Sequence, residues 1–343
     1  MEGTMKALYY QAAEQFDVRR VPIPKINDDQ VLVKVSYCGV CGTDAHVHVG
    51  EFGAKFPLIP GHEITGTIVS IGKHVEDFAV GDRCVADPGI LCEKCSYCRR
   101  GQHVLCENFK GAGVHVNGGF AEYIAFDAKK VYAIHNLTDE EAVMVEPAAC
   151  AIHGMDKLSP PVGVEVLIIG AGPTGLVLAQ LLKLNGAAKV VVVANKGPKM
   201  DLARSLDAGD EFVELDRNDP SSQWEEIKKK NPHGFDVVVE ATGSQKIAND
   251  SIDYVRRGGT LLIYGVYDES AFVHWKPSRI FADEIKIIGS FAQTHCFPRA
   301  VAYLESGKIK VKGIVTDVFG LEEYGKVLEK MRNREAVKIA IRP

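Results

Sequence analysis

The chain has 343 residues, of which 46% are hydrophobic and 25% are charged, and its formal net charge is −5. These proportions are typical of a globular protein, and the length exceeds what one ordinary core organises, so we expect two domains. The mild acidity argues against a surface that binds nucleic acid or anionic lipid, because either surface needs clustered Lys and Arg.

The first 60 residues are rich in Gly and Pro and predict short strands joined by turns. Val31–Val35 is an apolar run with β-branched residues, and Ile64–Ile71 alternates in the way that a strand does. We therefore expect a compact β-rich domain up to about residue 150.

The pattern changes near residue 150, where apolar strands begin to alternate with helical segments. This alternation predicts a parallel sheet with helices on both faces. Leu176–Leu184 is the first predicted helix, and the predicted strands are Val166–Ile169, Lys189–Ala194, Phe212–Leu215, Val237–Glu240, Leu261–Tyr264 and Ile285–Ile288. After about residue 290 the chain ends on a strand, Val337–Ile341, that can pair back into the first domain.

Cysteine usage and hydropathy indicate the compartment. No apolar run approaches the roughly 18–20 residues that span a bilayer, and the N-terminus shows no basic segment followed by an apolar one. Of nine cysteines, four are clustered, and the other five are scattered at Cys38, Cys41, Cys84, Cys150 and Cys296. Such a pattern is typical of a reducing compartment, and we expect a cytoplasmic protein.

One candidate metal site combines three ligand types. Cys41 opens the motif Cys-Gly-Thr-Asp-Ala-His at 41–46, and His62 and Glu63 follow it by about twenty residues. Cysteine, histidine and a carboxylate are the ligands of catalytic zinc, which keeps one position for water. Taken alone these residues are more often ordinary core and surface residues, so their weight comes from the two motifs that follow.

The clustered cysteines are spaced C-x2-C-x2-C-x7-C, at Cys92, Cys95, Cys98 and Cys106. Four thiolates at this spacing predict a closed tetrahedral zinc site that holds structure and leaves no position for chemistry. Two disulfides are the alternative and fit poorly with a reducing compartment. An iron–sulfur cluster remains a competitor, because short cysteine runs also hold clusters.

Residues 170–175 read G-x-G-x-x-G, directly after the first strand of the α/β region and at the start of its helix. This context is that of a dinucleotide-binding loop, in which the glycines permit the turn, the approach of the pyrophosphate and the packing of helix on strand. The alternative is a glycine-rich turn without function. We expect the cofactor to contact Gly170, Gly172, Pro173, Thr174 and Gly175, with its phosphates at the helix N-terminus.

The second strand of this region ends at Asn195, where an NAD site usually has Asp or Glu to accept from the ribose hydroxyls. Asparagine does not repel the 2′-phosphate of NADP, and Lys196 and Lys199 can pair with it. We therefore favour NADP over NAD. In the alternative interpretation the three residues face solvent in a turn, and NAD binds.

Together these motifs resemble the zinc-dependent medium-chain dehydrogenases along the whole chain. The resemblance implies an α/β protein with a β-rich GroES-like catalytic domain at 1–152 and 291–343. It also implies a Rossmann domain with a doubly wound parallel sheet at 153–290, and an active site in the cleft between the domains. Two zinc ions per chain are expected, one catalytic and one structural.

Position by position, the resemblance makes Cys41 and His62 ligands of the catalytic zinc. Where alcohol dehydrogenases carry a cysteine, this chain has Glu146, which resembles the sorbitol and polyol branch. We assign Cys41, His62 and Glu63 as ligands, with Glu146 as the fourth ligand or as the group that holds the bound water. Exchange of the two carboxylates during turnover is a hypothesis.

The resemblance also implies a proton relay and a hydride transfer. Thr43 takes the proton of the substrate alcohol and passes it through the ribose hydroxyls to His46, which leads to solvent. The alternative for His46 is an exposed loop histidine beside His48. The carbinol hydrogen leaves as hydride to C4 of the nicotinamide.

The polyol branch implies a sugar alcohol and its ketose as substrates. Many sorbitol dehydrogenases carry an Arg-Tyr pair where this chain has Ala292 and Gln293, which puts sorbitol in doubt, although Gln293 can hydrogen-bond a hydroxyl. The local pattern resembles arabinitol dehydrogenases, and we expect D-arabinitol to be oxidised to a pentulose.

Other readings remain open. A threonine or other secondary-alcohol dehydrogenase shares the zinc pattern, and a non-enzymatic zinc-ribbon protein that binds nucleic acid is a distant alternative. A zinc-free quinone reductase is opposed by the cysteines. The family implies a homo-oligomer, with a tetramer favoured, and we expect neither nucleic acid nor membrane as a partner.

Overall fold

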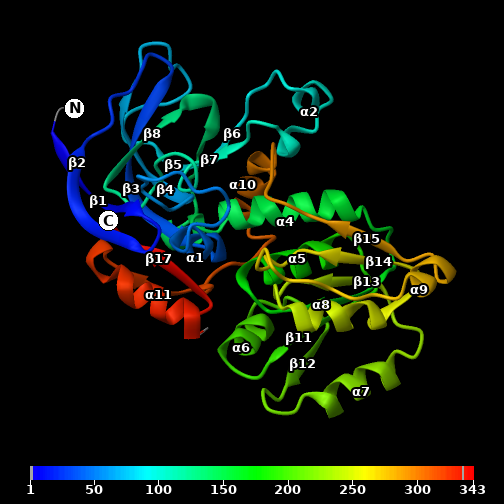
Figure 1. Ribbon diagram of the computed structural model, residues 1–343. Coiled ribbons are helices and arrows are strands. Elements are labelled where there is room, and N and C mark those ends of the chain that lie inside the picture. The colour runs from blue at the N-terminus through cyan, green and yellow to red at the C-terminus, as the bar shows by residue number, and fades with distance from the viewer. Residues whose placement is uncertain (1–2, 334–335) are drawn as a thin grey trace. The chain divides into compact units, whose positions relative to one another are not determined.

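The computed structural model describes residues 3–333 and 336–343 (Figure 1). The chain divides into two compact units, a first unit of residues 1–149 and 293–343 and a second unit of residues 150–292. Within the described residues, no helix is both long enough and apolar enough to cross a membrane.

The first unit is built mainly from strands. Its strands are β1 (Thr4–Ala12), β2 (Gln15–Pro22), β3 (Gln30–Val40), β4 (Glu63–Ile71), β5 (Arg83–Ala86), β6 (Gly89–Ile90), β7 (Lys110–Gly111), β8 (Tyr123–Asp127), β9 (Val131–Ala133), β16 (Val315–Phe319) and β17 (Lys338–Ile341). Its helices are α1 (Gly42–His48), α2 (Ser96–Arg99), η1 (His103–Leu105), η2 (Ala128–Lys130), α3 (Asp139–Ala142), α10 (Phe297–Glu305), η4 (Leu321–Glu323) and α11 (Tyr324–Asn333). Helix α4 (Val145–Leu158) starts in this unit and continues into the second.

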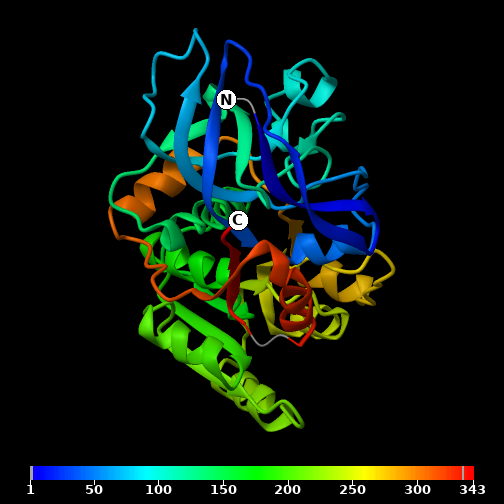
Figure 2. The same cartoon turned by 90° about the vertical axis from the view of Figure 1, so that its left-hand side faces the viewer.

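The main sheet of the first unit has the order β16-β17-β3-β4-β5-β9, and β8 also pairs with β3. Strand β17, red in Figure 2, lies antiparallel to β3, with Ile339 opposite Val40. The predicted pairing of the last strand with the first domain is therefore confirmed. Strand β4 is also antiparallel to β3, with Gly39 opposite Glu63. The end of β3 and the starts of β4 and β17 thus meet at one edge.

The second unit is a parallel sheet with helices. Its strands are β10 (Glu165–Ile169), β11 (Lys189–Asn195), β12 (Glu211–Leu215), β13 (Phe235–Glu240), β14 (Val255–Ile263) and β15 (Lys286–Gly289). Its helices are α5 (Pro173–Leu184), α6 (Pro198–Ser205), α7 (Ser221–Lys230), α8 (Gln245–Ser251), η3 (Ile252–Tyr254) and α9 (Pro277–Ala282). Each strand and the helix predicted from the sequence in this region are present, with ends shifted by a few residues.

The strand order in the second unit is β12-β11-β10-β13-β14-β15, and every neighbouring pair is parallel. Strand β10 therefore lies between β11 and β13, and the order reverses there. In open sheets of this kind the ligand binds beyond the carboxyl ends of the strands at the reversal. The Val- and Ile-rich strands at the centre of the sheet, β10, β11 and β13, are largely buried because helices cover a parallel sheet.

Candidate active site and metal centres

Three predicted ligands meet at the end of β3. Cys41 follows β3 and caps the N-terminus of α1, while His62 and Glu63 lie at the start of β4. The β3–β4 register brings these segments side by side. One ligand atom each from Cys41, His62 and Glu63 lie within 4.8 Å of one another. A sulfur, an imidazole nitrogen and a carboxylate oxygen at this spacing fit Zn²⁺.

Asp44 supports this group and was missed by the sequence analysis. It is buried, its Oδ2 accepts a hydrogen bond from the Cys41 backbone N–H at 2.8 Å, and its Oδ1 lies 3.9 Å from His62 Nδ1. A histidine that binds a metal commonly directs its second ring nitrogen to such a carboxylate. Burial lowers the pKa of His62, but the hydrogen bond to Cys41 and the charge of Asp44 raise it well above its usual value. The sequence signal that could have identified Asp44 is its position three residues after Cys41, where an acidic side chain can bond the backbone N–H at the start of a helix.

Glu63 also has a lysine partner from the far end of the chain. Lys338 Nζ lies 2.6 Å from Glu63 Oε1, and the two residues are only 5% and 1% exposed. Burial lowers the pKa of Lys338, but the charges of Glu63, Cys41 and Glu146 and the hydrogen bond to Glu63 together raise it, so the ammonium stays charged. A side chain on Gly39 would place its Cβ 1.9 Å from Glu63 Oε2, so glycine alone leaves room for the carboxylate. A lysine within an apolar strand was the sequence signal, because lysine is buried only when it is paired.

Glu146 lies near this group, outside the set of three. It is half-buried at the start of α4, and its charge raises the pKa values of both His62 and Lys338. Among the described residues here, only Cys41, His62 and Glu63 have ligand atoms that all lie within 4.8 Å of one another. The arrangement suits a carboxylate that holds a ligand or water beside the metal.

Thr43 and His46, the proposed relay residues, both lie on α1. The Thr43 hydroxyl is 3.7 Å from Cys41 Sγ. His46 is half-buried, its Nδ1 bonds Glu51 Oε2, and its ring meets that of Phe52 edge-on at a centroid distance of 4.9 Å. His46 therefore lies on a helix and is fixed by Glu51 and Phe52, unlike the exposed loop histidine of the alternative. The sequence analysis missed Glu51 as its partner.

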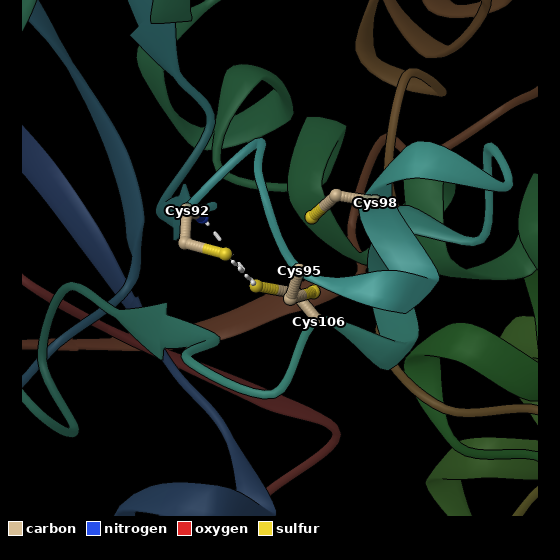
Figure 3. Close-up of side chains that lie close together, drawn as sticks. All are labelled: Cys92, Cys95, Cys98 and Cys106. Atoms are coloured by element: carbon tan, nitrogen blue, oxygen red, sulfur yellow. Dashed lines mark hydrogen bonds between the residues drawn. The ribbon is translucent and has the colours of Figure 1, made fainter.

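The side chains of the four clustered cysteines point toward one another in the segment of residues 92–106, called the lobe below (Figure 3). Ligand atoms of Cys92, Cys95, Cys98 and Cys106 lie within 4.8 Å of one another. The sulfurs of Cys92 and Cys106 are 3.5 Å apart, far beyond a disulfide bond of about 2.05 Å, and all four thiols are free. The backbone N–H of Lys94 is the main cause that lowers the pKa of Cys92 to about 6. Four convergent sulfurs with an N–H donor that favours thiolate fit a closed zinc site.

In the second unit, the glycine loop has the form that a dinucleotide requires. Gly170 has φ of 119°, and a Cβ on Gly175 would lie 2.6 Å from the Gly170 carbonyl oxygen, so backbone geometry demands both. Among the described residues, a Cβ on Gly172 would meet nothing within 4 Å, so packing within this part of the protein does not require glycine there. Close approach of a pyrophosphate explains it. Pro173 and Thr174 begin α5 beside it.

The residues expected to select the cofactor lie at the same edge. Asn195 ends β11 and is exposed, and Lys196 follows it, also exposed. Lys199 is half-buried in the first turn of α6. No carboxylate occupies the end of β11, and two lysines stand within four residues of Asn195.

Comparison with known proteins places these sites in a family. Residues 27–136 match the alcohol dehydrogenase GroES-like domain, and residues 173–306 match the zinc-binding dehydrogenase family. The chain is 61% identical to D-arabinitol dehydrogenase 1 of Uromyces fabae over 343 residues, which covers 100% of this chain and 98% of that protein. It belongs to the zinc-dependent medium-chain dehydrogenases, in their polyol dehydrogenase branch.

Two more distant relatives agree with this membership. Sorbitol dehydrogenase of Bacillus subtilis (strain 168) is 31% identical over 348 residues, 99% of this chain and 97% of that protein. The crystal structure of a zinc-binding dehydrogenase of Sinorhizobium meliloti 1021 bound to NADP has a TM-score of 0.92 at 32% identity, covering 99% of this chain and 100% of that chain. This polyol dehydrogenase is therefore an NAD(P)-dependent oxidoreductase.

The hydrogen bonds of Gln293 in this dehydrogenase lie within the first unit. The sequence analysis considered it a group that can hydrogen-bond a substrate hydroxyl. In the structure it is buried, its Nε2 donates to Asp87 Oδ1 at 2.9 Å, and its Oε1 accepts from the Cys296 backbone N–H at 3.3 Å. Asp87 also accepts from Lys130 Nζ at 2.9 Å. Both ends of the amide are thus engaged, and Gln293 fixes the segment before α10.

Replacing one lobe cysteine tests the structural metal site. Cys95→Ser removes one of four sulfur ligands, so we expect zinc content to fall by about one ion per chain and Tm to fall by roughly 5 °C, about 2 kcal/mol. The kcat of folded protein should persist, because the lobe contributes no residue to the Cys41 group. Plasma emission spectrometry and calorimetry measure these quantities.

Ser96→Ala, an exposed change in the same lobe, is the control. A Cys95→Ser protein with unchanged zinc content and unchanged Tm would show that the lobe holds no metal.

Proposed function

We propose that this polyol dehydrogenase oxidises D-arabinitol to a pentulose with NADP, using the Cys41, His62 and Glu63 group. The identity of 61% over the full chain to a D-arabinitol dehydrogenase carries the choice of substrate. The compact set of sulfur, imidazole and carboxylate ligands in the first unit supports the chemistry. The reaction transfers one hydride from the carbinol carbon to the nicotinamide and releases one proton.

In this proposal Cys41, His62 and Glu63 hold the catalytic zinc, and the four lobe cysteines hold a second. A zinc ion at the first position supplies a Lewis acid that lowers the pKa of a bound hydroxyl. Asp44 fixes the imidazole of His62 by its charge and position. The Thr43 hydroxyl, beside Cys41, accepts the substrate proton and passes its own through the ribose hydroxyls to His46, which Glu51 orients and which releases the proton to solvent.

In this proposal the carboxylate of Glu63 would have two cationic partners, the Lys338 ammonium and the zinc ion. With Glu63 already paired to Lys338, a second carboxylate would complete the donor set for a metal, and Glu146 is a candidate because its charge acts on both His62 and Lys338. The Lys338 pair thus supports exchange between Glu63 and Glu146 during turnover.

NADP is preferred in this proposal because of charge at the end of β11. The neutral Asn195 leaves a 2′-phosphate unopposed, and Lys196 and Lys199 lie within reach of the same turn along the chain. The NADP bound in the related Sinorhizobium structure agrees with this assignment.

The substrate is tested by initial rates of purified enzyme on D-arabinitol, L-arabinitol, ribitol, xylitol, sorbitol and L-threonine, each with NAD and with NADP. We expect the highest kcat/KM for D-arabinitol with NADP, about tenfold above other pentitols, because a misplaced hydroxyl leaves a polar group unpaired. A higher kcat/KM for sorbitol or L-threonine would overturn the substrate assignment.

The two carboxylates should separate when each becomes an amide. Glu63→Gln should lower both zinc content and kcat, whereas Glu146→Gln should keep zinc and lower kcat by about 10²-fold, because it loses only a neighbouring charge. Zinc analysis and stopped-flow rates measure both.

Glu76→Gln, an exposed change in the same unit, is the control. Because Glu63→Gln leaves the buried Lys338 unpaired, its Tm is recorded as well. Normal kcat in Glu146→Gln would remove that residue from the mechanism.

Changing the turn after β11 should change the cofactor. In Asn195→Asp with Lys196→Leu, the new carboxylate repels the 2′-phosphate and a cation is lost, so the ratio of kcat/KM for NADP to that for NAD should fall at least about tenfold. Lys229→Leu, exposed on α7, is the control. An unchanged ratio would contradict the assignment of these residues.

We also propose a homo-oligomer, with a tetramer favoured. Within the described sheet, β15 pairs only with β14. Ile287 on β15 is 37% exposed, and Phe281 on the preceding helix α9 is 87% exposed. An open strand edge with exposed apolar groups suits a two-fold contact. Light scattering of the purified enzyme measures its assembled mass.

A further inference from the structure

A buried carboxylate in the second unit has no part in the chemistry proposed above. Glu240 ends β13 and is fully buried. Its Oε1 accepts from the Thr242 backbone N–H at 2.8 Å and from the Thr242 hydroxyl. Its Oε2 accepts from the Gly243 backbone N–H at 3.2 Å and from the Tyr267 hydroxyl. An ionised carboxylate offers about four acceptor positions, so all are filled.

These donors come from two loops, the β13 loop (residues 241–244) and the β14 loop (residues 264–267). The loops pack backbone to backbone. A Cβ on Gly243, whose φ is 68°, would lie 2.0 Å from the Val266 carbonyl oxygen, and a Cβ on Gly265 would lie 2.2 Å from the Gly243 nitrogen. The backbone N–H groups of residues 264 and 265 both donate to the Glu240 carbonyl, at 2.9 and 2.8 Å. Glu240 therefore joins the two loops through its carbonyl and its carboxylate.

The β13 loop in turn rests on the glycine loop. The Ala241 N–H donates to the Ile169 carbonyl at 2.9 Å, and a Cβ on Gly170 would lie 3.0 Å from the Ala241 carbonyl oxygen. The loops after β10, β13 and β14 are thus stacked at the carboxyl edge of adjacent strands.

The position of these loops relates them to one half of a dinucleotide. The cofactor of such a sheet crosses the reversal beside β10, with its pyrophosphate on the glycine loop. Asn195, at the end of β11, marks the adenosine half on one side. The β13 and β14 loops lie on the other side, which leaves them the nicotinamide half.

We propose that Glu240 and Tyr267 are a positioning pair that holds the β14 loop in the shape required by the nicotinamide half of the cofactor. The inference rests on dinucleotide binding by this enzyme. Burial and the hydrogen bond to Glu240 raise the pKa of Tyr267, so its hydroxyl remains a donor. The Thr242 hydroxyl, which donates to Glu240, also accepts from the Ser244 N–H at 3.0 Å and so fixes the start of α8.

Two variants weaken the pair by different amounts. Tyr267→Phe removes one donor and keeps the ring. Glu240→Gln keeps the shape but turns an amide NH₂ toward a backbone N–H, at Thr242 or at Gly243, because each carboxylate oxygen faces one. Fluorescence titration gives Kd for NADPH and for 2′-phospho-ADP-ribose, which lacks only the nicotinamide. NADH and ADP-ribose form a parallel pair.

We expect Kd for NADPH to rise about threefold in Tyr267→Phe and about tenfold in Glu240→Gln, while Kd for the fragment changes less than about twofold. KM for the cofactor should rise with the Kd for NADPH. Tyr254→Phe is the control, a buried tyrosine that precedes β14 at the opposite end of the strand, and should change neither Kd.

Equal loss of NADPH and fragment binding would overturn the proposal, because it would show general loosening of the second unit. Unchanged binding of both ligands would also overturn it. If Glu240→Gln does not fold, as shown by Tm, Tyr267→Phe alone decides. Failure of the parent enzyme to bind either dinucleotide would overturn the cofactor assignment and this inference together.

Discussion

The buried ion pair of Lys338 and Glu63 is the constraint on which the first unit depends. Removing two charges from water is costly, and the cost is met only when each charge has a close partner. The pair forms because β17 and β4 flank β3 in a fixed register, which places residues 275 positions apart at one edge of the sheet. A register slip of one residue in either strand would reverse its side chains and leave a charge unpaired in the core. The candidate ligands Cys41, His62 and Glu63 lie at the same end of these strands, so one strand pairing sets both the sheet register and the geometry of the group.

The second unit is organised by close backbone contact instead of charge. Its loops at the carboxyl edge approach so closely that only glycine fits at Gly175, Gly243 and Gly265. Gly172 differs, since the protein leaves space beside it. The four glycines therefore divide into those required by the fold and one explained by the ligand. For Gly172 and Gly175 the motif already predicted this distinction, whereas the packing roles of Gly243 and Gly265 follow only from the structure.

The sequence predicted most of what depends on local pattern. Apolar runs predicted the strands of the parallel sheet, and motif spacing indicated Cys41, His62 and the four lobe cysteines as candidate metal ligands. The sequence did not reveal Lys338 and Glu51 as partners, because those contacts depend on tertiary placement. Nor did it reveal that Gln293 donates to Asp87, 206 positions away. A lysine in an apolar strand indicates that a partner is needed, but the local pattern does not identify a partner 275 positions away.

The two candidate metal sites differ in how far apart along the chain their ligand residues lie. The lobe draws its four sulfurs from residues 92–106, so closing that loop around an ion costs little chain entropy. The three-ligand group requires β3 and β4 to be paired, and its Asp44 and Lys338 partners to be in place. If both sites hold zinc as proposed, the lobe would be able to bind its ion while the rest of the chain is still unfolded, whereas the Cys41, His62 and Glu63 group would bind only once the sheet has formed. The spacing of the ligands along the chain would therefore make the lobe the first site to bind zinc.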